Sequence, residues 1–343
     1  MNISERMEHY QIPGLSLAII ENGQISSTES YGVLEAGRNQ RVNDQTIFNA
    51  CSISKFLTSV LIMKLSEEGI LDLDEDVNQK LTAWKVPNNT LTINNKVTLR
   101  NLLSHQSGII DPKGSFMRMN PKDSTPDMVE ILNGDTPYCN ESINIIAEPG
   151  STFQYSDAGY CIIQQLIEDV MGQSFHTEIF ERIFEPLKMT NSIFELKVTE
   201  KQAQNLSCGH NRYGKRIEGN YPFYPNPAGA GLWTSSSDLA LLVNDIIHSL
   251  YNESRLGLSQ ATIKEMISPQ GDIPWAGLGV FIEGKGHNVE FSSLGWGEGF
   301  QSMIVSYPYV KTAAVIMTNA DLGVHQMKGI IGEIYQSLTF EHA

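Results

Sequence analysis

The first part of the chain carries the pattern of an antiparallel hairpin. Residues 15–20 (LSLAII) are mostly apolar and follow a Pro-Gly break, which predicts a buried strand. Asn22-Gly23 comes next, and this dipeptide is typical of two-residue hairpin turns because both positions tolerate a positive φ. The return strand is predicted over residues 25–34. The chain is therefore expected to open with two paired strands.

A helical pattern begins at Ser52 and ends near Glu68. Apolar side chains occupy nearly every side of this segment, and Gly69 supplies a stop, so the pattern predicts a buried helix. Further helices are predicted at residues 99–104, 127–132, 158–171, 177–184, 237–250 and 260–266. The middle of the chain is thus expected to be mostly helical.

Strand patterns return in the last quarter of the chain. They are predicted at residues 278–281, 289–293, 301–306 and 312–318, before a last amphipathic helix at 324–338. Strands at both ends with helices between them predict an α+β fold. In this predicted fold, an antiparallel sheet is formed by both chain ends and flanked by helices, and a mostly helical lobe is inserted into it.

The predicted organisation is a single module over residues 1–343. Its sheet lobe comprises residues 1–60 plus 235–343, and its helical lobe comprises residues 61–234. A ligand site is expected at the seam between the lobes, since small-molecule sites favour such junctions.

Composition narrows the classes of partner. The 24 Lys+Arg against 39 Asp+Glu give a net charge of −15, and no basic run is present. Such a surface repels phosphate backbones and acidic membranes, so neither nucleic acid nor a membrane is an expected partner. A small-molecule substrate that is neutral or cationic fits better, and the sequence leaves the oligomeric state open.

The N-terminal residues indicate where the protein is located, and the spacing of the cysteines indicates whether a metal site is expected. Met1 to Arg6 show no signal-peptide pattern, which predicts a cytoplasmic protein unless a leader was removed from a secreted or periplasmic precursor. The four cysteines are scattered without a C-x-x-C pair, and no histidine pair has ligand spacing. Neither a metal nor another cofactor is expected, and the thiols are expected to pack as small hydrophobes.

The strongest candidate chemistry lies at the start of the apolar helix. Ser52 and Lys55 are three residues apart, which places them on one helix face. A buried lysine loses hydration and could act as a base toward a serine hydroxyl, while the Ser52 N–H at the helix start could face an oxyanion. The alternative is that Ser52 is only a helix cap and Lys55 a surface lysine.

Ordered sequence blocks extend this signal over nearly the whole chain. The blocks are IPGLSLA (12–18), TIFNACSISK (46–55), VTLRNLLSHQSG (97–108), EPG (148–150) and GAGLWTS (229–235). In this order the sequence resembles the serine β-lactamase and penicillin-binding-protein superfamily, in its branch of class C β-lactamases, D-aminopeptidases and related carboxylesterases. The resemblance implies the fold predicted above and an acyl-enzyme formed on Ser52, and it implies structural support from His105.

The family's second motif, Y-x-N, is altered. Literal matches at 138–140 and 224–226 lack the family's context, whereas Tyr155-Ser156-Asp157 has it, so the resemblance implies that Tyr155 is the second base. Asp157 replaces the usual asparagine. Beside Lys55 it would raise that lysine's pKa and move base duty toward Tyr155; alternatively, it would receive an amino group of the substrate.

The third motif differs from the family's pattern more than the second motif does. Ser293-Leu294-Gly295-Trp296 stands where the family has K-T-G or H-x-G, while the K-T-A at 311–313 lies on the next strand. A serine there removes the charge-assisted contact to a substrate carboxylate. Gly295 would still let a substrate approach the strand, and the resemblance implies that the Trp296 N–H is the second oxyanion donor.

These features together predict a serine hydrolase that acts through an acyl-enzyme on small ester or amide substrates, including amino-bearing ones. A β-lactamase or a D-alanyl-D-alanine-type carboxypeptidase is the alternative. A catalytically silent relative that serves as a binding module is a further alternative, motivated by the changes at Asp157 and Ser293.

Overall fold

The opening hairpin forms where the sequence predicts it. A computed structural model describes residues 1–194 and 200–338, and in it β1 (Gly14–Glu21) pairs antiparallel with β2 (Gln24–Gly32). Asn22 and Gly23 have φ of 52° and 71°, so both turn residues adopt the left-handed region. This is the geometry of a type I′ turn, which matches the twist of the two strands.

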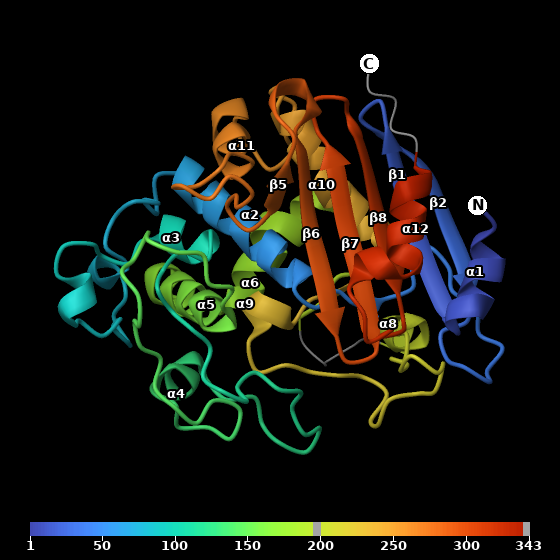
Figure 1. The fold of residues 1–343 in the computed structure, drawn as a ribbon, viewed down its shortest axis with the longest axis horizontal. Helices are drawn as coiled ribbons and strands as arrows, with labels where there is room; N and C mark the ends of the chain where they lie inside the picture. The colour runs from blue at the N-terminus through green and yellow to red at the C-terminus, as the bar shows by residue number, and fades with distance from the viewer. Residues whose placement is uncertain (195–199, 339–343) are drawn as a thin grey trace.

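The two ends of the chain build one antiparallel sheet of six strands, in the order β2-β1-β8-β7-β6-β5. The remaining strands are β5 (Phe281–Glu283), β6 (Glu290–Gly297), β7 (Phe300–Tyr307) and β8 (Thr312–Thr318). The N-terminal β1 pairs directly with the C-terminal β8 (Figure 1). The predicted fold class is therefore confirmed.

Helices cover both faces of this sheet. On one face, α1 (Ile3–Tyr10) and α12 (Ile330–Ser337) share a core with alternate strand residues such as Leu15, Leu17 and Ile316. On the other face, α2 (Ile53–Glu67) contacts β6 and β7, and α10 (Ser236–Ser249) contacts β1 and β8. Figure 1 shows α12 in front of the sheet and α10 behind it. Both faces are therefore covered over the central strands, while the outer strand β2 stays partly exposed.

The inserted part is mostly helical and packs against α2. Its helices are α3 (Leu99–Leu103), α4 (Met128–Asn133), α5 (Asp157–Met171), α6 (Phe175–Ile179), a π-helical turn Phe180–Phe184, α7 (Glu185–Leu187), α8 (Glu200–Asn205) and α9 (Pro227–Ala230); α11 (Gln260–Met266) follows α10. Short 3₁₀ turns occur at Val77–Gln79, Thr90–Thr92, Gly286–Asn288 and Gln326–Lys328. A two-stranded sheet of β3 (Phe48–Asn49) and β4 (Trp233–Thr234) lies beside α2.

Several predicted boundaries differ from the structure. The strand predicted at 289–293 continues to Gly297 as β6, and the strand predicted at 278–281 occurs as β5 at Phe281–Glu283. The last helix is interrupted at Gly329, so that α12 begins only at Ile330. Residues 206–210 fall in the predicted helical lobe. Backbone N–H groups of this segment nevertheless donate hydrogen bonds to the carbonyl oxygens of Ile47, Leu34 and Gly299, which belong to the predicted sheet lobe.

Two further expectations concern the cysteines and the membrane. All four cysteines lie in the described ranges, where they are buried and free. Over residues 1–194 and 200–338, the structure contains no helix of the length and apolarity needed to cross a bilayer.

Candidate active site

Ser52 stands at the junction between a strained loop and α2. The residue before it, Cys51, has a φ of 49°, which is uncommon for a side chain other than glycine, and its N–H donates to Asn49 Oδ1 over 2.8 Å. The Ser52 side chain makes no capping hydrogen bond, and its N–H has no acceptor among the described residues. Both the hydroxyl and the N–H are therefore available to a ligand. Ser52 occupies the N-cap position of α2, but its side chain does not cap the helix.

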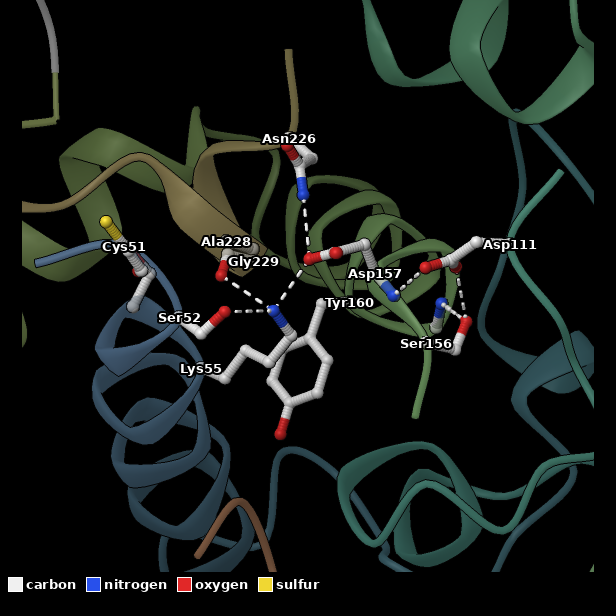
Figure 2. Close-up of polar contacts among 12 residues, drawn as sticks. Cys51, Ser52, Lys55, Asp111, Ser156, Asp157, Tyr160, Asn226, Ala228 and Gly229 are labelled. Carbon is white, nitrogen blue, oxygen red and sulfur yellow. Dashed lines mark hydrogen bonds and ion pairs between the residues drawn. The ribbon is translucent and has the colours of Figure 1, made fainter. Parts of the chain in front are cut away.

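Lys55 lies one turn further along α2 and is almost completely buried, with 3% of its surface exposed. Its Nζ lies 3.3 Å from Ser52 Oγ, 2.6 Å from Asp157 Oδ1 and 2.9 Å from the Gly229 carbonyl oxygen. Figure 2 shows the ammonium group between these three oxygens. The alternative that Lys55 is a surface lysine is therefore wrong.

The environment of Lys55 keeps it charged. Burial by itself lowers the pKa of Lys55, but the Asp157 carboxylate beside it and the Tyr155 phenol raise the pKa by more, so the net shift is upward. The idea that burial leaves this lysine partly neutral is thus corrected. The other expectation, that Asp157 beside Lys55 raises its pKa, agrees with the geometry.

Two residues that were not among the predicted site residues complete this contact. Asn226 Nδ2 donates to Asp157 Oδ1 over 3.0 Å, although the Y-x-N match at 224–226 was set aside as lacking the family's context. Gly229 permits the close packing, since a Cβ at this position would lie 2.8 Å from Asp157 Oδ1. Both belong to the segment around α9, which reaches the site only through tertiary folding.

Asp111 holds the start of α5, where Asp157 is the first residue. Its carboxylate accepts hydrogen bonds from the Ser156 hydroxyl at 2.9 Å, the Asp157 N–H at 3.0 Å and the Ala158 N–H at 2.9 Å (Figure 2). Burial and the Asp157 charge raise the pKa of Asp111, while these hydrogen bonds act in the opposite direction. Asp111 therefore fixes the backbone that carries Tyr155, Ser156 and Asp157.

Tyr155 is placed by an aromatic stack. Its ring lies 4.3 Å from the His105 ring at an interplanar angle of 27°, and Lys55 Nζ is 4.9 Å from the Tyr155 ring centroid. His105 Nδ1 accepts a hydrogen bond from the Ser156 N–H over 3.1 Å. Tyr155 is 37% exposed, so its ring faces both Lys55 and the open site.

His105 should make stability depend on pH. Burial and the Lys55 charge lower its pKa from 6.5 to about 3, so between these values the unfolded chain binds a proton that the folded protein excludes. Stability is therefore lost as pH falls from 6.5 toward 3, by up to about 1.4 kcal/mol per pH unit. Denaturant unfolding between pH 6.5 and 5 should show a smaller slope for His105→Gln, whereas exposed His287→Gln should retain the wild-type slope.

The β6 residues form the opposite wall. A Cβ on Gly295 would lie 2.2 Å from the Ala50 carbonyl oxygen, so only glycine lets this strand approach the loop that leads to Ser52. Ser293 is 5% exposed and lines a pocket together with Ser52 and Lys55. The Trp296 indole donates to Asp321 Oδ1 over 2.8 Å. The structure thus brings all predicted site residues to one end of α2 and β6, while their roles stay predictions.

No group of three or more His, Cys, Asp or Glu side chains with metal-binding placement occurs within the described ranges. Lys55, Asp157 and Asp111 are instead satisfied by one another and by neighbouring polar groups.

A mixed sheet-and-helix fold with a serine and a buried lysine at the start of its central helix places the chain in a known class. The chain belongs to the β-lactamase family, whose sequence pattern (described as Beta-lactamase) matches residues 2–331. The predicted resemblance to the β-lactamase and penicillin-binding-protein superfamily is thus confirmed.

Relatives and solved structures agree with this placement. "Protein flp" of Staphylococcus aureus (strain N315) is 27% identical over 331 residues, which cover 92% of this chain and 61% of flp, so the chain spans about three-fifths of that relative. The crystal structure of SurE with D-Leu superposes with a TM-score of 0.77 at 20% identity, covering 98% of this chain and 74% of SurE. The β-lactamase/D-alanine carboxypeptidase of Yersinia pestis, complexed with citrate, superposes with a TM-score of 0.72 at 18% identity. The superposition covers 99% of this chain and 98% of the Yersinia chain.

Proposed function

We propose that this protein is a serine hydrolase that forms an acyl-enzyme on Ser52 with small ester or amide substrates. The observation that carries the proposal is the contact between Ser52 Oγ and the buried Lys55 Nζ at 3.3 Å, within a network that holds Lys55 in place. A buried lysine facing a serine hydroxyl whose side chain caps nothing is difficult to explain as packing.

Tyr155 is the base in the proposed mechanism. Because Asp157 keeps Lys55 protonated, the lysine serves as a cationic anchor, and its charge beside the Tyr155 ring stabilises negative charge on the phenol oxygen. Tyr155 Oη takes the Ser52 proton as Ser52 Oγ bonds to the substrate carbonyl carbon. The same proton passes to the leaving group when the carbonyl–heteroatom bond breaks.

The second half of the cycle reverses these roles. Water attacks the acyl carbonyl and gives its proton to Tyr155, and this proton returns to Ser52 Oγ as the acid product leaves. In both halves, the proposed oxyanion donors are the Ser52 N–H, which no described residue uses, and the Trp296 N–H on β6.

Charge around the site favours uncharged or amino-bearing substrates over carboxylates. Ser293 supplies no cation at the position where the family holds a substrate carboxylate, and the whole chain has a net charge of −15. We therefore rank esters and short amides first and β-lactams second. The carboxypeptidase named in the Yersinia structure is a family precedent for amide hydrolysis.

A substrate panel tests the proposal. A p-nitrophenyl ester, a D-amino-acid amide and a chromogenic cephalosporin are offered to the purified protein, and we expect turnover of the ester or the amide to exceed that of the cephalosporin. If none of the three is turned over by folded protein, the hydrolase proposal fails and the silent binding module is favoured.

Asp157→Asn separates the two proposed roles of this carboxylate. Asp157 Oδ1 accepts hydrogen bonds from Lys55 and Asn226, and the Asp157 side chain is 23% exposed. If Asp157 also receives a substrate ammonium, the ratio of kcat/KM for a D-amino-acid amide over its N-acetylated form should fall about tenfold. An unchanged ratio would show that Asp157 acts on Lys55 alone, in which case only the pH dependence of kcat should shift, to lower pH.

A further inference from the structure

The pocket beside Ser52 has two unlike walls. One wall carries Ser52, Lys55 and Tyr155, which the proposed mechanism uses. The other is formed by side chains from β6 and from the segment that leads into β5, together with Phe153. A substrate whose carbonyl carbon reaches Ser52 must place one of its two substituents against this second wall.

The second wall is apolar. The residues that line it include Phe153, Val280 and Phe281, whereas the Leu294 side chain packs against the core beneath α12. Trp275 extends it to the surface: its ring centroid lies 4.4 Å from that of Phe153 and 6.3 Å from that of Phe281, and it is 43% exposed. A half-exposed tryptophan at the rim offers apolar area that a ligand can cover.

The same pocket offers no free cation. Among the described residues that line it, Lys55 is the one charged side chain, and Asp157 already neutralises it at 2.6 Å. His105 is held neutral by burial and by the Lys55 charge, which lower its pKa to about 3. A carboxylate placed there would lose its water without gaining an unpaired partner.

Ser293 supplies the one polar group of this wall. It is 5% exposed, and its hydroxyl forms no hydrogen bond with any residue that the structure describes. A hydroxyl can donate to or accept from a neutral amide or ester, but it cannot balance a full negative charge.

From this wall we infer that the pocket between Ser293, Phe281 and Ser52 takes an uncharged, apolar substituent of the substrate, and that it discriminates against a carboxylate at this place. The inference rests on the proposed function and extends it, because it assigns the chemical class that the β6 side of the site recognises. Phe281 determines specificity through apolar contact, and Ser293 does so by lacking charge.

Two matched substrate pairs test the inference on either side of the scissile bond. One pair varies the acyl group, p-nitrophenyl butyrate against p-nitrophenyl hydrogen succinate. The other varies the leaving group, phenyl acetate against 3-acetoxybenzoate. In at least one pair the uncharged member should have a kcat/KM at least about tenfold higher, because its carboxylate counterpart is desolvated without a partner.

Ser293→Lys should reverse the preference within that same pair. A lysine would supply the missing charge-assisted contact, so the ratio should shift by about tenfold toward the carboxylate. Ratios within twofold of unity for both pairs in the wild-type protein, unchanged in Ser293→Lys, would overturn the inference. Because this result is read from substrates that are turned over, it differs from a failure of the proposed function, in which no member of either pair is hydrolysed.

Phe281→Ala provides a second test of the apolar wall in case Ser293→Lys does not fold. Loss of this ring should lower kcat/KM for the preferred uncharged substrate by about tenfold while its carboxylate partner changes little. Phe180→Ala is the matched control, since Phe180 is 55% exposed on the π-helical turn and does not line the pocket. Equal losses for both members of the pair in Phe281→Ala would contradict the apolar assignment.

Discussion

Ser52→Ala is expected to lower kcat for every accepted ester or amide by on the order of 10³-fold or more, since no other group can replace the nucleophile of a covalent mechanism. The Ser52 hydroxyl touches Lys55 at 3.3 Å and caps no backbone group, so its removal should leave the fold intact. Initial rates with a p-nitrophenyl ester, together with the midpoint of denaturant unfolding, measure both effects.

A serine outside the site provides the control. Ser26→Ala, on the exposed face of the outer strand β2, removes the same atom and should keep wild-type kcat. If Ser52→Ala retains more than about a tenth of wild-type kcat while Ser26→Ala is normal, hydrolysis proceeds without Ser52 and the mechanism proposed above is wrong.

Tyr155→Phe is expected to lower kcat by about 10²-fold to 10⁴-fold, the usual contribution of a positioned acid-base group. The change removes only the phenol oxygen, because the ring keeps its stack on His105 at 4.3 Å. KM should change little, since the proton transfer occurs in the transition state. Steady-state kinetics with an ester and an amide provide the measurement.

Tyr160 offers a matched control for this prediction. Its ring also faces Lys55 Nζ, at 5.6 Å, but its hydroxyl lies 3.1 Å from Ser59 Oγ and donates to the Leu103 carbonyl oxygen over 3.3 Å. Tyr160→Phe should therefore cost about 1 kcal/mol of stability while kcat stays within a few-fold of wild type. Equal losses of kcat in the two variants would remove Tyr155 from its role as base.

Local rules account for the parts of the fold that the sequence predicted well. The turn at Asn22-Gly23 follows from the positive φ that both residues tolerate, and the buried helix follows from apolar residues on all its sides. The pairing of Ser52 with Lys55 follows from helix geometry alone, because residues three apart share a face.

Tertiary contacts explain what the sequence could not reveal. Asp111 bonds to the α5 start across 45 residues of chain, and Asn226 reaches Asp157 across 69, so no local spacing marks either one. The strand predicted at 289–293 stops short of Gly295, although β6 continues to Gly297. Gly295 is required by the Ala50 carbonyl oxygen, a neighbour that only the folded chain supplies.

The charge of Lys55 is another property that the sequence alone could not decide. Burial alone argues for a neutral lysine, whereas the carboxylate of Asp157 at 2.6 Å outweighs burial and keeps it protonated. Sequence could propose both outcomes, since Asp157 stands two residues after Tyr155, but only the distance decides between them.

The most direct test of the acyl-enzyme is intact-mass spectrometry of the protein mixed with a slowly hydrolysed p-nitrophenyl ester. We predict a mass increase equal to one acyl group, located by peptide fragmentation on Ser52 and absent from Ser52→Ala. Fragmentation must distinguish Ser52 from its neighbour Cys51, whose pKa is raised by burial. Turnover without any adduct under rapid quenching, or an adduct that persists in Ser52→Ala, would contradict the assignment of Ser52 as the nucleophile.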